Sequence, residues 1–234
     1  MHMLSMNELI LSERALREGL IFDWMLRKGL LKDRFSFQSS IRERTVIHQS
    51  QRFAVDRRRA EYVAKHSLSI YDNTFGILHH DIGEGRDLLW AAAMLHACGQ
   101  HINLSSYHKH SWYLIRHGEL LGYSYIEHLM VAAIARYHRR SLPKKRHEAW
   151  QVLSKRENRR IVSEMAILLR LATSLDRRPE PAVESIAIKA NLKEVIFDLH
   201  PQSNQDLSLE KWSLMNCSGI IRDIYDLELR VIVS

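Results

Sequence analysis

The chain has 234 residues, of which 46% are hydrophobic, so it can bury a core and is not disordered throughout. Its 34 lysines and arginines outnumber its 27 aspartates and glutamates, which gives a formal net charge of +7. No apolar run approaches the roughly 20 residues of a membrane span, the N-terminus has no signal-peptide pattern, and Cys98 and Cys217 form no paired motif, so we expect a soluble cytoplasmic protein with reduced thiols and no membrane partner.

Residues 1–52 are expected to form an N-terminal helix followed by a linker. Apolar residues recur at helical spacing between Leu11 and Leu31, and Gly29 is suited to end that helix. Residues 33–52 are polar and irregular in pattern, which is typical of a linker or a short exposed helix. We therefore place a domain boundary near residue 52.

Residues 53–180 are expected to form a helical domain. Asp56 is a candidate N-cap for a helix whose buried face carries Ala60, Val63, Ala64, Ser67, Leu68 and Tyr71. Further helices are expected at residues 87–98, 109–117, 124–137 and 158–174. In the last of these the inward positions are Ile161, Met165, Leu168, Leu169 and Ala172.

Residues 181–234 are expected to form a small α+β subdomain. After Pro179 and Pro181 the apolar period changes to two, which predicts strands around Ile186–Ile188, Val195–Leu199 and Leu227–Val233. Leu209, Trp212 and Met215 recur at helical spacing between the second and third strands. The predicted fold class is therefore mainly α, a helical bundle followed by about three strands and a helix.

The positive charge is local. Ten lysines and arginines lie between Arg136 and Arg160, where only Glu148 and Glu157 oppose them. Such a concentration indicates a polyanionic partner or a phosphate-bearing ligand. Together with the segment around Lys109, it predicts these phosphate-binding residues: Lys109, His110, Arg136, His138, Arg139, Arg140, Lys144, Lys145 and Arg146.

Histidines suggest a second kind of chemistry, since eight of the 14 fall between His96 and His147. Helical metal phosphohydrolases bring together a histidine on an early helix, a His-Asp pair on a second helix and an aspartate on a late one. The segment His79-His80-Asp81 offers such a pair, but Gly83 and Gly85 place it in a loop.

His96 is better placed, at the end of an apolar helix, although the following Ala97 cannot bind a metal. Two residual positions, His96 and Asp176, therefore remain. His96 can equally be a hydrogen-bonded core histidine, and Asp176 a helix-terminal carboxylate paired with Arg177 or Arg178. His66 is interpreted as a partly buried helix residue.

In several stretches the chain resembles the C-terminal region of the Ppx/GppA proteins, which are exopolyphosphatases and guanosine pentaphosphate phosphohydrolases. The matching stretches are Ala15–Leu20, Leu88–Ile102, His108–Ile115, Leu121–Ser124, Arg136–Arg140 and Leu168–Arg177. The resemblance implies an HD-domain-like helical bundle and a small α+β tail. It also implies that the chain starts at the last helix of an actin-like phosphatase domain, so that the catalytic residues and their Mg²⁺ belong to a domain absent from this chain.

The chain departs from the family pattern at two positions. Arg59 stands where the family helix often begins with a metal-type histidine, and Ala97 replaces the aspartate of the His-Asp pair. A fixed positive charge disfavours a cation and favours a salt bridge or a bound phosphate. We therefore add Arg59 to the phosphate-binding residues and expect no catalytic residue, no metal site and no cofactor in this chain.

The resulting hypothesis is a non-catalytic module that binds inorganic polyphosphate or guanosine polyphosphate and forms a homodimer, as the resemblance implies. One alternative is a metal-dependent HD phosphohydrolase using His79, His80, Asp81, His96 and Asp176 in some combination. A second is a nucleic-acid-binding module, which has the required charge but no recognised motif.

Overall fold

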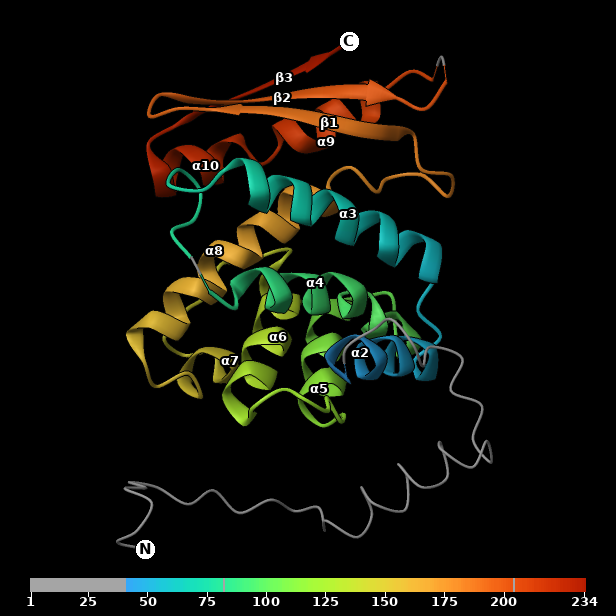
Figure 1. Ribbon diagram of the computed structural model, residues 1–234, viewed down its shortest axis with the longest axis vertical. Coiled ribbons are helices and arrows are strands. Elements are labelled where there is room, and N and C mark those ends of the chain that lie inside the picture. Colours follow the sequence, from blue (N-terminus) through green and yellow to red (C-terminus); the bar gives the residue numbers. More distant parts are fainter. Residues whose placement is uncertain (1–40, 82, 204) are drawn as a thin grey trace, which may run out of the picture. The chain divides into compact units, whose positions relative to one another are not determined.

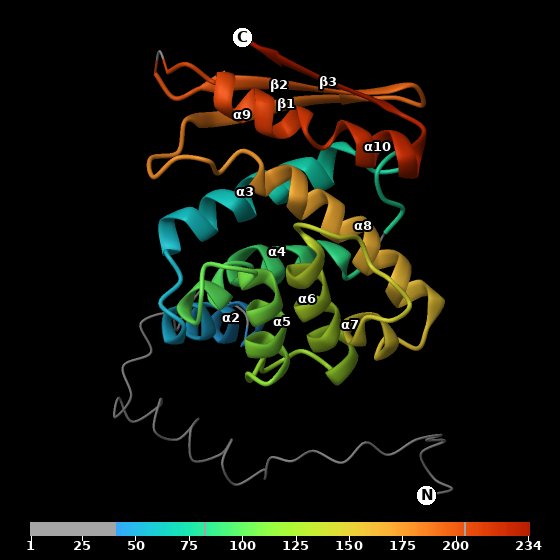
Figure 2. The ribbon, with the colours of Figure 1, turned by 180° about the vertical axis from the view of Figure 1, so that it is seen from behind.

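The computed structural model describes residues 41–81, 83–203 and 205–234, and these residues belong to one compact unit. The helix expected at Leu11–Leu31 lies outside the described residues. Helices dominate, and a small three-stranded sheet lies at the C-terminal end, which confirms the predicted fold class (Figures 1 and 2). The elements in chain order are α2 (Ile41–Arg52), α3 (Arg57–Asn73), α4 (Gly85–Leu95), the 3-10 helix η1 (Cys98–His101), α5 (Tyr107–Arg116), α6 (Tyr125–Tyr137), α7 (Glu148–Gln151), α8 (Arg156–Thr173), β1 (Val183–Ala190), β2 (Glu194–Pro201), α9 (Ser208–Met215), α10 (Ser218–Tyr225) and β3 (Glu228–Val233).

Helix α2 falls in the segment for which a linker or a short exposed helix was predicted. It is helical, but Val46 is completely buried, so the helix is not simply exposed. Arg42 donates a 2.9 Å hydrogen bond to Asp87 of α4 and also binds Glu127 of α6. These ion pairs fix α2 to the helical bundle.

Helices α4 and α6 form the centre of the bundle. Both carry runs of alanine that are fully buried, Ala91–Ala93 in α4 and Ala132–Ala133 in α6. Small side chains let the two helices approach closely, and a helix that is apolar on most sides belongs in a core. Ser124 and Glu127 form a capping box that fixes the first turn of α6.

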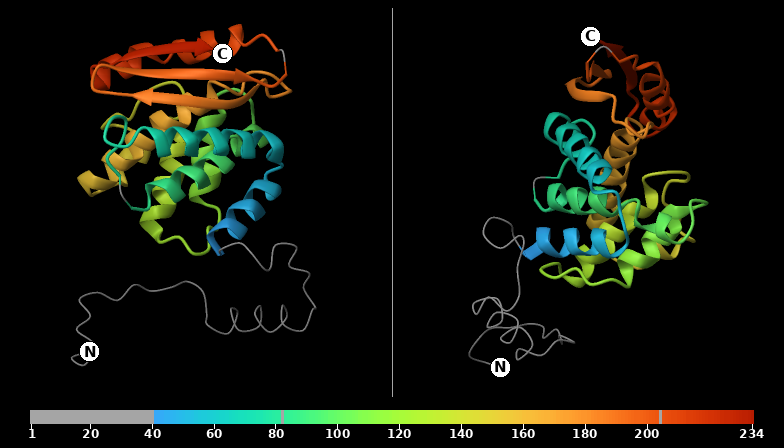
Figure 3. Two further views of the ribbon diagram at one scale, coloured as in Figure 1. Left: turned by 45° about the horizontal axis from the view of Figure 1, so that its top comes forward. Right: turned by 90° about the vertical axis from the view of Figure 1, so that its right-hand side faces the viewer.

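Helices α3 and α8 were both predicted from the helical spacing of their apolar residues. Asp56 caps α3 by accepting a hydrogen bond from the backbone amide of Arg59, as predicted. In α8 the predicted inward positions Met165, Leu168, Leu169 and Ala172 are completely buried. Helix α3 contacts α4, α8 and strand β1, so it lies between the bundle and the tail (Figure 3).

The tail contains the three predicted strands in the order β1-β2-β3. β1 and β2 form an antiparallel hairpin, and β2 pairs with β3 in parallel. A parallel pair needs a crossover connection, and α9 and α10 supply it, so the tail has one more helix than predicted. The alternating residues Val195, Phe197 and Leu199 are completely buried, as the period of two indicated.

Hydrogen bonds between distant residues help to join the tail to the helical bundle. The Tyr225 hydroxyl donates to the Leu78 carbonyl at 2.8 Å, and Lys65 donates to the Glu184 carbonyl at 2.9 Å. Arg178, just after α8, donates at 3.0 Å to Glu210, whose side chain is completely buried in α9. In the described part of the chain no helix is both long and apolar enough to cross a bilayer.

Candidate functional site

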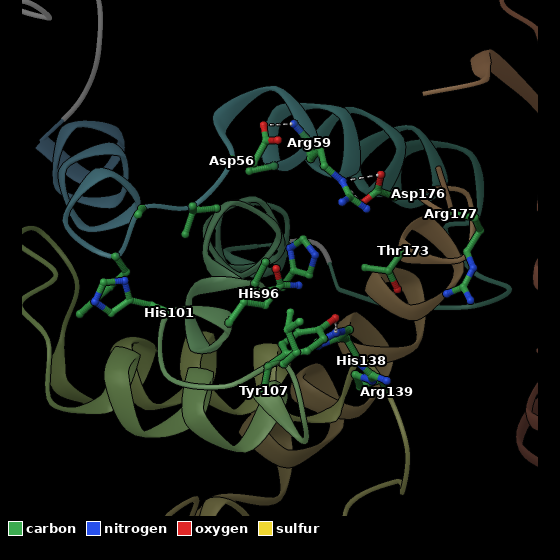
Figure 4. A pocket seen from close by; sticks show the side chains of 17 residues that line it. Asp56, Arg59, His96, His101, Tyr107, His138, Arg139, Thr173, Asp176 and Arg177 are labelled. Carbon is green, nitrogen blue, oxygen red and sulfur yellow. Dashed lines mark hydrogen bonds and ion pairs between the residues drawn. The ribbon is translucent and has the colours of Figure 1, made fainter. Parts of the chain in front are cut away.

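A cavity of about 740 Å³ opens where several helix ends meet. Its wall is formed by the α2–α3 connection, the first turn of α3, the end of α4 with η1, the start of α5, and the ends of α6 and α8. Arg59, His96, Ala97 and Asp176, which are far apart in sequence, all line it (Figure 4). The cavity thus collects the positions where the sequence suggested the remains of a metal site.

Arg59 and Asp176 form a two-pronged ion pair across the cavity wall. Nε of Arg59 lies 3.1 Å from each carboxylate oxygen of Asp176, and Nη2 lies 2.9 Å from Oδ2. Hydrogen bonding to Asp176 raises the pKa of Arg59 above its usual value. Of the two roles predicted for Arg59, the structure shows the salt bridge.

The alternative pairing of Asp176 with Arg177 or Arg178 is wrong. Arg178 is turned towards Glu210, and the described residues give Arg177 no ion-pair partner. A fork-shaped guanidinium matches a carboxylate best when both oxygens can be reached at once, and Arg59 has that geometry.

His96 and His138 lie side by side in the cavity wall as buried, neutral rings. Nδ1 of His96 lies 2.7 Å from the Ala93 carbonyl, and Nδ1 of His138 lies 2.6 Å from the Ala135 carbonyl. Because a carbonyl only accepts, each Nδ1 carries the proton and each Nε2 is an acceptor. Burial lowers the pKa of both histidines below 6.5. The interpretation of His96 as a hydrogen-bonded core histidine is confirmed.

Tyr107 connects His138 to two arginines. Its hydroxyl lies 3.0 Å from Nε2 of His138, to which it donates. The guanidinium of Arg139 lies over the Tyr107 ring, 4.6 Å from its centre. Burial raises the pKa of Tyr107, whereas the positive charges of Arg139 and Arg177 oppose that rise. Both arginines therefore lie close to the phenol within the cavity.

The floor of the cavity depends on a close contact between η1 and α5. Ser111 donates to the His96 carbonyl at 2.7 Å and accepts from the Gly99 amide at 3.0 Å. A Cβ on Gly99 would lie 2.1 Å from the Tyr107 carbonyl oxygen, so only glycine allows this approach. The contact between Gly99 and Ser111 therefore holds His96 and Tyr107 on neighbouring walls of the cavity.

A second feature lies next to the cavity. It is a group of lysines and arginines around His108 and His147, which we call the basic cluster. Burial, together with the nearby positive charges, lowers the pKa of His108 to about 4. Burial and neighbouring cations also lower the pKa of His147. The cations that act on one or both rings are Lys109, Arg136, Arg139, Arg140, Lys144 and Arg146. They come from α5, the end of α6 and the loop before α7.

Across the ranges that the structure describes, none of the six basic-cluster side chains pairs with a carboxylate. Other members of the basic run are engaged elsewhere. Arg160 pairs with Glu164, and Arg159 lies over the Trp150 ring. Of the positive charges between residues 136 and 160, only some are therefore without a partner among the described residues.

The remaining predicted phosphate-binding residues divide into two groups. Lys145 is exposed in the loop that also carries Lys144, and His110 is half-buried on α5. By contrast, His138 is 1% exposed, and both of its ring nitrogens have partners. His138 is therefore a wall residue, and Arg59 is occupied by Asp176.

Arg170 is a site residue that the sequence reasoning missed. It donates to the carbonyls of Tyr137, His138 and Arg140 at 3.1, 3.1 and 2.9 Å. Burial lowers its pKa. By satisfying the last carbonyls of α6, Arg170 fixes the turn that carries Arg139 and Arg140. A lone arginine in the apolar stretch Leu168–Leu171 was the available signal.

The segment His79-His80-Asp81 has a structural role at the other end of α3. Asp81 Oδ2 accepts from the Gly85 amide at 2.9 Å and from the Tyr71 hydroxyl at 2.9 Å, so it holds the start of α4. His79 stacks on Tyr71. Because Arg59 and Tyr71 are separated by about 18 Å of helix, this segment does not reach the cavity.

The metal-site combinations that join His79, His80 and Asp81 to His96 and Asp176 are therefore wrong. Over residues 41–234, leaving aside positions 82 and 204, no three or more His, Cys, Asp or Glu side chains are grouped so that they could hold a metal ion. His66 lies in α3 as predicted, but it is completely rather than partly buried, and burial lowers its pKa to about 4.

Comparison with known proteins identifies related sequences. The model of the family described as "Ppx/GppA phosphatase, domain III" matches residues 41–217. Among curated relatives, the protein named guanosine-5'-triphosphate,3'-diphosphate pyrophosphatase from Pseudoalteromonas atlantica is 29% identical over 218 residues, covering 89% of this chain and 41% of the relative. Its namesake from Vibrio campbellii is 30% identical over 183 residues, covering 77% of this chain and 34% of the relative.

A third protein of that name, from Pseudoalteromonas translucida, is 32% identical over 141 residues, or 60% of this chain and 27% of the relative. The chain thus spans less than half the length of the curated relatives it matches. The matched part contains the helical bundle, the cavity and the basic cluster.

Proposed function

Because this chain belongs to the Ppx/GppA phosphatase family and matches its domain III, we propose that it is a binding module that holds a phosphate chain on the basic cluster. The ligand is inorganic polyphosphate or a guanosine polyphosphate, the second being suggested by the names of the relatives. In this role the module binds the substrate and does not hydrolyse it.

The observation that supports this proposal most is a group of six cations around His108 and His147 that have no carboxylate partner among the described residues. Mutual repulsion makes such a cluster costly, and a polyanion relieves it by neutralising several charges at once. Arginines contribute forked pairs to phosphate oxygens and lysines contribute mobile point charges. A chain of phosphates offers one anionic group after another along such a surface.

Several features argue against hydrolysis by this chain. Arg59 places a positive charge in the cavity beside Asp176, which disfavours a cation there, and Ala97 offers no ligand. We therefore propose that the catalytic groups, and the Mg²⁺ that the family resemblance implies, belong to a separate domain.

We also propose that the module forms a homodimer through the outer face of the tail. Three large apolar side chains of α9 are exposed, Leu209 by 40%, Trp212 by 60% and Met215 by 37%. Exposed apolar side chains grouped on one helix face are typical of an interaction surface.

A binding experiment tests the phosphate proposal. The affinity for inorganic polyphosphate is measured calorimetrically at low salt for the wild-type chain and for the double variant Lys109→Ala/Arg140→Ala. Each exposed charge contact contributes about 0.5–1 kcal/mol, so we expect the double variant to bind roughly tenfold more weakly. An assay for released orthophosphate, run on the same samples, is expected to stay at background.

The matched control is Lys189→Ala/Lys193→Ala, which removes the same charge from exposed positions of the β1–β2 hairpin. It is expected to bind like the wild type. If both double variants lose the same affinity for polyphosphate, net charge alone accounts for binding and the basic cluster is not the site. If polyphosphate does not bind to the wild-type chain, the proposal is refuted.

A further inference from the structure

Three backbone carbonyls at the C-terminal end of α6 accept hydrogen bonds from one side chain of another helix. Nη2 of Arg170 donates to the carbonyls of Tyr137 and Arg140 at 3.1 and 2.9 Å. Its Nε donates to the His138 carbonyl at 3.1 Å. The last carbonyls of a helix have no partner within the helix itself. Because Arg170 belongs to α8, which packs against α6, these hydrogen bonds tie the end of one helix to the other.

The backbone of Arg140 adopts an unusual conformation. Its φ is +64°, in the left-handed region that favours glycine. A residue with a Cβ keeps such a conformation only where the surrounding structure holds it. One of the hydrogen bonds from Arg170 ends on the carbonyl of this residue. Arg170 therefore holds the chain at the point where it leaves α6 in a conformation that arginine rarely adopts.

The same turn carries two cations of the basic cluster. The charges of Arg139 and Arg140 both lower the pKa of His108, so both guanidinium groups lie near that ring. The guanidinium of Arg139 also lies over the Tyr107 ring, 4.6 Å from its centre, beside His138 in Figure 4. A change in the turn after α6 therefore moves both cations.

Arg170 itself is not one of the six cations of the basic cluster. Its side chain is half-buried, and burial lowers its pKa. Among the described residues it has no carboxylate partner, so its polar contacts are the three carbonyls. The geometry is that of a support for the turn and not that of a side chain exposed to a ligand.

We propose that Arg170 is a positioning residue for phosphate binding. By holding the three carbonyls at the end of α6, it presents Arg139 and Arg140 to a phosphate chain without touching the chain itself. The role needs a planar guanidinium, because its donors reach several acceptors in a fixed arrangement, whereas a lysine is a single point charge. This inference rests on the proposed function and adds the residue that keeps the cluster in its binding arrangement.

Two substitutions of Arg170 separate its geometry from its charge. The affinity for inorganic polyphosphate is measured calorimetrically at low salt, well below the melting temperature of each protein, for Arg170→Gln and Arg170→Lys. We expect both variants to bind about tenfold more weakly than the wild type, because neither side chain holds all three carbonyls. If Arg170→Lys binds like the wild type, charge alone is sufficient and the proposal is overturned.

The matched control is Arg160→Gln on the same helix, which removes a charge that is paired with Glu164. It is expected to leave the affinity for polyphosphate unchanged. Thermal unfolding followed by circular dichroism reports stability separately. If Arg170 has only a structural role, its substitution lowers the melting temperature and leaves the affinity of the folded protein unchanged, and that outcome contradicts positioning.

Substitutions of Arg140 test the turn itself. Arg140→Gly and Arg140→Ala remove the same guanidinium, but only glycine adopts a φ of +64° without strain. We expect adding Arg170→Gln to weaken polyphosphate binding about fivefold in the alanine background and only about twofold in the glycine background. Equal losses in the two backgrounds would mean that Arg170 does not act through this turn.

The outcomes also separate this inference from the proposed function. If the wild type does not bind polyphosphate, the proposed function itself fails. If Lys109→Ala/Arg140→Ala weakens binding while both Arg170 variants bind like the wild type, only the role of Arg170 is refuted. If neither Arg170 variant folds, Arg170 is required for the fold and the positioning role is refuted as well.

Discussion

At the scale of single residues, Arg59 determines whether the cavity can hold a metal ion. A histidine at this position would offer a neutral nitrogen to a metal, whereas the guanidinium brings a permanent charge and occupies both oxygens of Asp176. His96 keeps an acceptor nitrogen, but at Ala97 no donor atom is present. The charge of Arg59 and the missing ligand at Ala97 therefore disfavour a cation in this cavity.

This account predicts that a metal site can be rebuilt. In the variant Arg59→His/Ala97→Asp, two ligands join His96 and Asp176, and the competing charge is lost. We expect this variant to bind about one Mn²⁺ or Co²⁺ per chain, measured by elemental analysis after gel filtration, while the wild type binds none.

Adding Asp176→Asn to the double variant serves as the control and is expected to abolish metal binding. If the folded double variant retains no metal, then Arg59, His96, Ala97 and Asp176 do not form one site.

Single residues also show what the sequence could reveal. Asp56 as an N-cap, His96 at a helix end and the concentration of positive charge around Arg139 and Arg140 followed from local pattern. The partner of Asp176 did not, because Arg59 lies 117 residues away and only the packing of α3 against α8 brings them together. The position of Arg177 in the cavity wall likewise depends on how α8 packs against α3 and α6, which no local pattern encodes.

At the scale of elements, the cavity exists because helix ends rather than helix faces converge. Gly99 and Ser111 hold η1 against α5, and Arg170 holds the last turn of α6. Long amphipathic helices and alternating strands were predictable from their periods of 3.6 and two residues. Helix α7 and η1 have four residues each, which is too short to show a period.

Helix α10 was missed although it has a usable signal. Ile220, Ile221 and Ile224 recur at helical spacing, and Ile221 is completely buried. The stretch follows α9 directly, so a single helix was the simpler interpretation. The parallel pairing of β2 and β3 explains why a longer connection is needed.

At the scale of elements, the proposed dimer can be tested on helix α9. If its outer face joins two copies, Trp212→Asp places a charge in the interface and is expected to convert the dimer to a monomer. Sedimentation velocity on both proteins provides the measurement. The control is Lys211→Asp, an exposed neighbour on the same helix that should leave the dimer intact. A wild-type chain that sediments as a monomer would contradict the dimer.

On the scale of the whole molecule, the basic cluster and the proposed dimer face lie on different elements. The basic cluster lies on α5, α6 and the loop before α7, whereas Leu209, Trp212 and Met215 of the proposed dimer face lie on α9. The order of residues revealed that the positive charge was concentrated between Arg136 and Arg160. The i,i+4 spacing of Arg160 and Glu164 in the predicted helix was a usable signal for their ion pair. The contact of Arg159 with the Trp150 ring was not predictable, because Trp150 belongs to another helix.

The central claim is that several cations of the basic cluster neutralise a phosphate chain together. The most direct test is the salt dependence of polyphosphate affinity, measured between about 50 and 200 mM monovalent salt. Each neutralised phosphate releases counterions, so the logarithm of affinity should fall linearly with the logarithm of salt, by roughly 0.7 per contact if polyphosphate behaves as single-stranded nucleic acids do. We predict a steep slope for the wild type and a slope smaller by roughly 1.4 units for Lys109→Ala/Arg140→Ala, which removes two contacts. An affinity that does not change with salt, or identical slopes for the two proteins, would contradict the account.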